Sequence, residues 1–244
     1  MGNIILSNFQ QITVIGRHSV EEFLDQSPEL IESLYLGPKP LEAFSDRKKY
    51  PHFLGKVFPI KQLALRPQDE DAADQGFVAK VRLPIYSAQD LPQLLEGEKS
   101  CLILDHLLDP HNVGACIRSA CAFGVRVILM PKHASCQVTS TVAKVAAGGL
   151  ARVKIVMGNL GQMVRQLKDI GFWVAATSEH GQTLELSQLS GSIAWIVGNE
   201  QKGVSESLLK SSDWVFCLPT QADFPSLNVS VATGIVLYLS SQNR

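Results

Sequence analysis

Short apolar runs alternate with segments of helical periodicity from about residue 99 to the end of the chain. Continuous runs rich in β-branched and aromatic residues, such as 193–197, are typical of strands that are buried on both faces of a parallel sheet. The predicted strands are 101–105, 125–130, 153–156, 172–177, 193–197 and 214–218. The predicted helices lie at about 113–123, 139–147, 160–170, 204–211 and 227–241. The pattern therefore predicts an α/β fold in which helices cover both faces of a parallel sheet.

The first part of the chain is less regular. A short helix is predicted at 21–24, and strands are predicted at 34–36 and 77–81. The stretch 83–98 contains two prolines and a glycine, which is typical of a linker. We therefore expect a small N-terminal α/β domain at 1–82, a linker at 83–98 and a larger domain at 99–244.

Composition and charge exclude several classes of protein. Apolar residues make up 45% and charged residues 18% of the 244 residues, which excludes a disordered or low-complexity chain. The formal net charge of −1 excludes a strongly basic protein, so any RNA binding must come from a local patch. The run Arg47-Lys48-Lys49 is one candidate, although such a run is more often a solvated surface.

The five cysteines form no CxxC pair and have no histidine at zinc-ligand spacing. Their odd number and apolar neighbours favour reduced, buried thiols in a cytoplasmic protein without a metal. The longest uncharged run, 224–243, contains several polar residues, so we expect no membrane span.

The first loop that carries candidate chemistry follows the strand at 101–105. Asn112 is expected to cap the next helix, and Gly124 to end it. Arg118 lies two turns further along, where it can face an anion near the positive end of the helix. The alternative is a capped helix that carries a solvated arginine.

The second loop follows the strand at 193–197 and runs from Gly198 to Gly203. Its two glycines allow close approach of the backbone to a ligand, and Glu200 between them offers an acceptor or a base. The alternative is a turn that caps the next helix. Neither a GxxxxGK[ST] phosphate loop nor a GxGxxG fingerprint is present, which disfavours a dehydrogenase-like nucleotide-binding protein.

The third loop leads into the last helix. Ser226 is expected to cap that helix, and Asn228 in its first turn is harder to explain by packing. The alternative is an ordinary capped core helix.

Together the three loops resemble the ordered motifs of a known family. The stretches are Asn112-Val-Gly-(three residues)-Arg118, Gly198-Asn-Glu-(two residues)-Gly203 and Ser226-Leu-Asn-Val-Ser-Val-Ala232. They are similar in order, spacing and identity to the motifs of the SpoU/TrmH family, the RNA ribose 2′-O-methyltransferases of the SPOUT superfamily. This resemblance covers essentially all of 99–244.

The front segment resembles the small ribosomal-protein-like (L30e-like) RNA-binding domain of one branch of that family. The matching stretches are Val14-Ile-Gly-Arg-His-Ser-Val20 and Gln75-Gly-Phe-Val-Ala79. The layout is closest to the bacterial enzymes that methylate a guanosine ribose in 23S rRNA. A tRNA ribose methyltransferase and a non-catalytic RNA-binding relative remain the alternatives.

The resemblance implies an α/β sheet whose C-terminal part forms a deep trefoil knot, and a homodimer with the last helix and the first-motif helix at its interface. It also implies that S-adenosylmethionine binds in the knot. The residues expected to hold the cofactor are Thr177, Gly198, Asn199, Glu200, Gly203, Leu218, Pro219, Ser226 and Leu227. Those expected to be catalytic are Asn112, Arg118, Glu200, Ser226 and Asn228.

Methyl transfer from a sulfonium to a ribose hydroxyl requires positioning and the removal of one proton, without a metal. A guanidinium stays charged at physiological pH, so we expect Arg118 to clamp an RNA phosphate and to orient the attacking oxygen. Asn112 and Asn228 would orient the ribose and the arginine. Whether Arg118 or Glu200 handles the proton stays open at this point.

Overall fold

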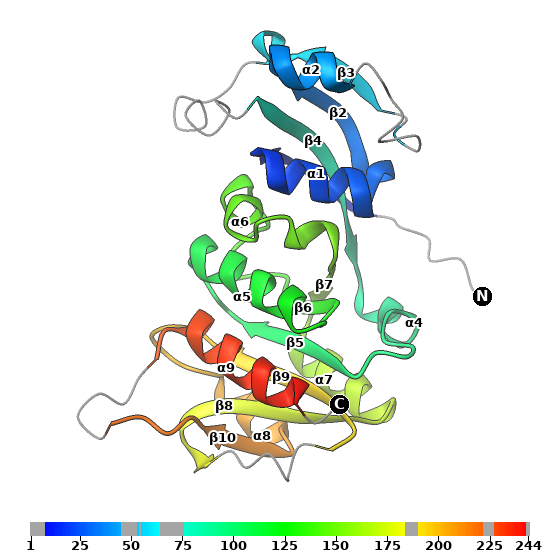
Figure 1. The fold of residues 1–244 in the computed structure, drawn as a ribbon. Coiled ribbons are helices and arrows are strands. Elements are labelled where there is room, and N and C mark those ends of the chain that lie inside the picture. The colour runs from blue at the N-terminus through cyan, green and yellow to red at the C-terminus, as the bar shows by residue number, and fades with distance from the viewer. Residues whose placement is uncertain are drawn as a thin grey trace.

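The structure is a computed structural model, and it describes residues 8–44, 53, 55–63, 76–183, 190–221 and 227–242. Its described part contains a sheet in the order β10-β8-β9-β5-β6-β7-β4-β2-β3, and β1 pairs with β4 beside this path (Figure 1).

The N-terminal elements are β1 Phe9–Ile15, α1 Arg17–Gln26, η1 Pro28–Leu30, β2 Ile31–Leu36, α2 Pro38–Phe44, β3 Lys56–Pro59, η3 Ile60–Gln62 and β4 Phe77–Tyr86. The next elements are η4 Ala88–Asp90, α4 Leu91–Leu94, β5 Ser100–Asp105, α5 Pro110–Ala122, β6 Val127–Pro131, α6 Ser140–Val145, η5 Gly149–Ala151 and β7 Lys154–Gly158. The last are α7 Leu160–Asp169, β8 Phe172–Thr183, β9 Ser192–Gly198, α8 Glu206–Ser211, β10 Trp214–Cys217 and α9 Val229–Ser241.

The C-terminal strands form a parallel sheet between two layers of helices. Strands β5 to β10 pair in parallel with one another, as the apolar runs predicted. Leu102 and Leu104 of β5 pack on the same side as α5, α6 and α9, whereas Cys101 and Ile103 pack with α4, α7 and α8. Alternate residues of one strand thus face two separate cores, which explains why these strands are apolar without interruption. The predicted α/β fold is confirmed at this level.

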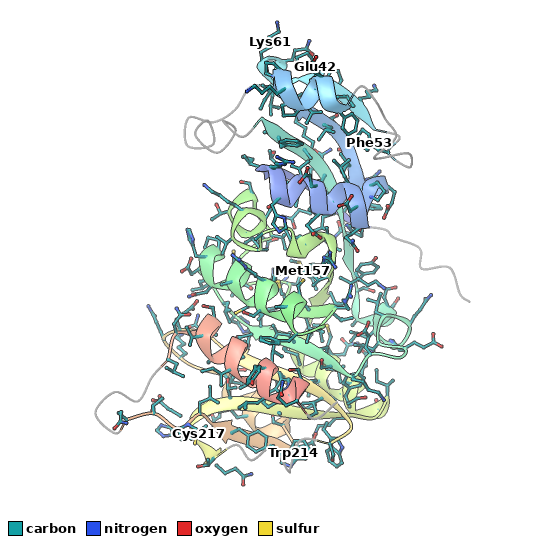
Figure 2. The ribbon with its side chains drawn as sticks, viewed as in Figure 1. Glu42, Phe53, Lys61, Met157, Trp214 and Cys217 are labelled. Carbon is teal, nitrogen blue, oxygen red and sulfur yellow. The ribbon has the colours of Figure 1, made fainter. Side chains whose placement is uncertain are left out.

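Strand β4 connects the N-terminal module to this sheet. Most of it pairs antiparallel with β1 and β2, whereas its last residues, Ile85 and Tyr86, pair in parallel with β7. The stretch interpreted as a linker, 83–98, holds the end of β4, η4 and α4, and its Leu91 and Leu94 are buried. Phe53 and Lys61 lie at the end of the molecule that β2, β3 and α2 form, and Trp214 and Cys217 lie at the opposite end (Figure 2).

Polar contacts also tie the N-terminal module to the larger part. Glu22 of α1 pairs with Arg152, which follows η5, at 2.7 Å between Oε2 and Nε. Ser27 donates to the carbonyl of Ala151 at 3.0 Å, and the Gln10 amide donates to the carbonyl of Val138 at 2.7 Å. The run Arg47-Lys48-Lys49 lies outside the described residues.

The ends of the helices correct two of the expected caps. Asp109, not Asn112, caps α5, because its Oδ1 accepts the N–H of His111 at 2.8 Å and Pro110 begins the helix. Asn228 caps α9 by accepting the N–H of Ser230 at 2.8 Å, whereas Ser226 lies outside the described residues. Gly124 follows the end of α5 with a φ of 71°, as predicted.

The cysteines also differ in part from expectation. All five are free thiols, but only Cys101 and Cys116 are buried, and Cys121, Cys136 and Cys217 are half-buried. Within the described ranges, no helix combines the length and the apolar character that crossing a membrane requires.

Candidate active site

The carboxyl ends of β8, β9 and β10 form one edge of the parallel sheet. Ala176 of β8 pairs with Ile196 of β9 and with Val215 of β10, so the three strands reach this edge together. Thr177, Gly198 and Leu218 follow these positions within a few residues. Ligands of open parallel sheets bind outside such an edge, which makes it the candidate site.

Strand β8 is irregular at this edge. Val215 pairs with Ala176, but the next residue of β10, Phe216, pairs with Gln182, so residues 177–181 have no regular partner in β10. A Cβ on Gly181 would lie 2.6 Å from the carbonyl carbon of Phe216, so the two backbones are in close contact there. The strand predicted to end at 177 continues to Thr183, because Gln182 and Thr183 pair with Phe216 and Cys217 beyond the irregularity.

The loop after β9 is a tight turn. The backbones of Asn199 and Gly203 exchange two hydrogen bonds of 3.0 and 2.8 Å, and the Asn199 Oδ1 accepts the N–H groups of Gln201 and Lys202. A Cβ on Gly198 would lie 2.1 Å from the carbonyl carbon of Gly203, so only glycine lets the loop fold back on itself. Glu200 is therefore presented, exposed, at the tip of a constrained loop.

This loop is attached to the end of β5 at both of its ends. The Asn199 amide donates to the carbonyl of His106 at 2.8 Å, and the N–H of Ser205 donates to Asp105 Oδ2 at 2.6 Å. The other oxygen of Asp105, which is buried, lies 2.6 Å from the Nδ1 of His106. His106 has a left-handed φ of 56°, which is uncommon for a residue other than glycine.

Sequence reasoning missed Asp105 and His106. The available signal was a pair of polar residues at the end of an otherwise apolar strand, which is where ligand-binding and loop-fixing groups lie in parallel sheets.

Three side chains from distant segments meet at the candidate site. The Asn228 amide donates to Asn112 Oδ1 at 3.0 Å, and the Asn112 amide donates to Glu200 Oε1 at 2.8 Å. Asn228 is oriented in turn by the N–H and the hydroxyl of Ser230, which both donate to its Oδ1. Each amide has its donor and acceptor ends fixed, so the Glu200 carboxylate is held while it remains exposed.

Close helix packing places Asn112 at this point. Gly114 lies two residues further along α5, and a Cβ there would lie 2.7 Å from Val145 Cβ of α6. On the other side, Cys116 Sγ lies 3.3 Å from Thr233 Oγ1 of α9, and burial raises the pKa of this thiol to about 12. The glycine and the small buried thiol let α5 pack tightly between α6 and α9.

The remaining residues expected at the site are less closely joined. Arg118 is exposed on α5, and no hydrogen bond to Asn112, Glu200 or Asn228 is found for it in the described part. The Thr177 hydroxyl donates to the carbonyl of Ile196 at 3.2 Å. Leu218 is half-buried, whereas Pro219 and Leu227 are exposed at the rim. No group of three or more histidine, cysteine or acidic side chains that could hold a metal ion occurs within the described ranges.

This arrangement can perform proton-transfer and positioning chemistry. A carboxylate fixed by an amide can accept a proton from a bound hydroxyl, and an exposed guanidinium nearby in the helix can pair with an anion.

Comparisons with known proteins identify the same family as the three sequence motifs do. The family model for the SpoU rRNA Methylase family matches residues 99–238. The 23S rRNA (guanosine-2′-O-)-methyltransferase RlmB of Photorhabdus laumondii is 35% identical over 242 residues, covering 95% of this chain and 98% of that protein. The protein of the same name from Escherichia coli K12 is 34% identical with the same coverage.

Solved structures share the fold. The SpoU methyltransferase AviRb from Streptomyces viridochromogenes, in complex with AdoMet, has a TM-score of 0.76 at 20% identity, covering 96% of this chain and 92% of that one. A TrmH/SpoU tRNA modifying enzyme from A. aeolicus has a TM-score of 0.54 at 26% identity, covering 64% of this chain and 83% of that one. From the family match and the full-length relatives, the chain belongs to the SpoU rRNA methylase family.

Proposed function

We propose that this protein transfers a methyl group from S-adenosylmethionine to the ribose 2′-hydroxyl of a guanosine in 23S rRNA. The observation that carries the proposal is the hydrogen-bonded set Asn112, Glu200 and Asn228, assembled from three distant segments at the carboxyl edge of the sheet. Relatives that carry the 23S rRNA name match 95% of the chain, so they include the N-terminal module as well as the site.

The residues at the strand ends fit the proposed cofactor. Gly198 brings the loop backbone against itself, and Gly203 has open space where a Cβ would lie, so backbone groups rather than side chains border the edge. Thr177, Gly198, Asn199, Glu200, Gly203, Leu218, Pro219 and Leu227, together with Ser226, are the residues that would hold it. When bound, S-adenosylmethionine supplies an electrophilic methyl group on a sulfonium.

The chain's own residues then have distinct tasks. Asn112 and Asn228 fix the orientation of the Glu200 carboxylate, which we assign as the acceptor of the ribose proton. Arg118 keeps its charge and holds an RNA phosphate from the exposed side of α5. Ser226, which lies outside the described residues, stays a predicted catalytic residue of the third motif.

The proposed architecture follows the resemblance. Residues 1–82 form an L30e-like RNA-binding domain, 83–98 a linker, and 99–244 a catalytic domain whose C-terminal part is knotted as a trefoil. The protein acts as a homodimer in the cytoplasm, joined through α9 and α5. Support for the dimer comes from the exposed Val231 and Tyr238 on α9 and the exposed Leu227 just before it, since exposed apolar patches often mark interfaces.

Two alternatives are weaker. A tRNA substrate is disfavoured because the tRNA modifying enzyme aligns with 64% of this chain, whereas the rRNA relatives align with 95%. A non-catalytic RNA-binding protein has no need of a carboxylate fixed by two amides in series.

The test is a two-part experiment. Calorimetric titration should give micromolar binding of S-adenosylmethionine and S-adenosylhomocysteine and no binding of NAD. Transfer of tritiated methyl groups should then label 23S rRNA from a strain that lacks the enzyme, with 16S rRNA and tRNA as controls. Labelling of tRNA alone, or cofactor binding without any labelling, would contradict the proposal.

A further inference from the structure

A cavity of about 590 Å³ lies at the carboxyl ends of β5, β6 and β7. Its walls include Leu160 of α7 and Leu208 of α8, which belong to the core on the opposite face of the sheet from α5 and α9. The cavity is therefore separate from the Asn112, Glu200 and Asn228 set. Its volume is typical of a pocket for a small molecule or a nucleotide.

Basic side chains line the cavity from two strand ends. Lys132 and His133 follow β6, and His106 follows β5; all three are exposed. Among the described lining residues, Asp105 supplies the carboxylate, but it is buried and both of its oxygens already accept hydrogen bonds or pair with His106. The cavity therefore presents cationic and N–H donor groups to an occupant, which favours an anion.

Apart from Asn159, whose Oδ1 accepts the N–H of Gln162, the rest of the wall is apolar or small. The largely buried Pro131, Leu160 and Leu208 form its apolar part, and Gly158 and Gly161 contribute no side chain. A free phosphate would use only the basic part of this lining. A nucleotide would use both parts, because its phosphate is anionic and its base has flat apolar faces.

The cavity shares its wall with the loop that presents Glu200. Asp105, His106 and Ser205 line it, and the same residues hold the two ends of the 199–205 loop. An occupant of the cavity thus lies behind the catalytic loop, against the residues that fix its position.

We propose that this cavity binds a phosphate-bearing nucleotide of the substrate RNA other than the one that is methylated. This inference rests on the proposed function, because it takes RNA as the molecule that reaches the carboxyl edge. Lys132 and His133 contact the phosphate, and the apolar wall contacts the base.

The test compares two variants, each of which removes positive charge at a different place. Lys132→Ala combined with His133→Ala removes the two basic groups that follow β6 and leaves His106 in place, and Lys154→Ala removes an exposed lysine at the opposite end of β7. Fluorescence anisotropy with a short labelled single-stranded RNA should show binding weakened about tenfold in the first variant. The slope of log K against log salt should become shallower by about 0.7 for each RNA phosphate that the variant no longer neutralises. Lys154→Ala should keep both values.

A third variant, the second one in the cavity, guards against misfolding. Ser207→Asp places a carboxylate in the cavity, and an acidic residue in the first turn of α8 is compatible with the helix. It should weaken RNA binding with an unchanged unfolding temperature. RNA affinity and salt slope equal to those of Lys154→Ala in both cavity variants would overturn the inference.

Competition identifies the source of the phosphate. If guanosine 5′-monophosphate displaces the RNA from the wild type but inorganic phosphate does not, a free nucleotide is sufficient to occupy the cavity. If neither displaces the RNA, occupation requires the RNA strand, and the RNA affinity of the cavity variants then decides whether the cavity is used. Cofactor affinity and methyl transfer are measured on the same preparations. If the wild type binds RNA through the cavity but does not methylate it, the proposed function is contradicted and this inference stands. If the cavity variants bind and methylate RNA as the wild type does, this inference is contradicted and the proposed function stands.

Discussion

Glu200 is held by an amide and not by a cation in the described part of the chain. The Asn112 amide fixes one oxygen of the carboxylate and leaves the other free to face a bound hydroxyl. The same amide is fixed from behind by Asn228. At the scale of single residues, the site is thus built to orient a carboxylate.

Glu200→Gln tests this role, since the amide oxygen can still accept from Asn112. We expect methyl transfer to fall by about 100-fold or more, because a positioned base contributes that much, with cofactor affinity retained. Arg118→Ala should also abolish transfer while cofactor binding survives. Single-turnover kinetics and calorimetry measure the two effects. An unchanged rate in Glu200→Gln would assign the proton to another group, and loss of cofactor binding in Arg118→Ala would contradict the division of roles.

The buried thiols predict how stability depends on pH. Burial raises the pKa of Cys101, and it raises that of Cys116 to about 12 from 9.0. Above pH 9 the unfolded chain loses these protons while the folded chain keeps them, so the free energy of unfolding should fall as pH rises. The slope approaches about 1.4 kcal/mol per pH unit for each thiol. Urea unfolding between pH 8 and pH 10 measures it, and Cys101→Ala with Cys116→Ala should show a smaller slope than the wild type.

At the scale of elements, the site depends on places where regular structure is interrupted. Residues 177–181 leave the regular pairing of β8, and the loop at 198–203 folds back on the end of β9. Both interruptions rely on glycine, at Gly181 and Gly198, because a Cβ would meet backbone atoms. The candidate site thus depends on two close backbone approaches that regular strand pairing does not contain.

Gly198→Ala should therefore damage the loop more than an ordinary substitution. The added Cβ would lie 2.1 Å from backbone carbon and nitrogen atoms, so the loop must move, at a cost of about 1–3 kcal/mol or more. We expect a lower unfolding temperature and loss of cofactor binding. Gly161→Ala in α7 is the matched control, since its Cβ would meet only Asn159 Oδ1 at 3.4 Å. Equal behaviour of the two variants in calorimetry would contradict this account.

At the scale of the whole molecule, the two faces of the sheet have different roles. One face of the sheet carries α5 and α9, and the other carries α7 and α8 (Figure 1). Asn112 of the candidate site lies on α5, whereas the cavity is lined by residues of α7 and α8. The exposed fractions of Val231 and Tyr238 on α9 are both 50%, which is large for apolar side chains in a helix that otherwise packs into the core. A second copy of the chain would cover them.

Val231→Asp tests the proposed dimer. A charge buried in an apolar interface is costly, so the variant should sediment as a monomer at concentrations at which the wild type is a dimer. The residue is exposed on α9, so the fold of the single chain should be retained and circular dichroism should be unchanged. A monomeric wild type, or a dimeric variant, would contradict the proposed interface.

The sequence by itself determined the order and type of the C-terminal elements, because apolar runs, helical periodicity and glycines at the ends of helices are local signals. It also placed Asn112, Glu200 and Asn228 in three ordered motifs, although it assigned the cap of α5 to Asn112 instead of Asp109. Only the tertiary structure decided that these three side chains bond across 88 and 116 residues, that Asp105 and His106 hold the 199–205 loop, and that β8 loses its register beside β10. These features depend on strand order, register and close backbone approach, and such long-range geometry leaves no periodic trace in the chain.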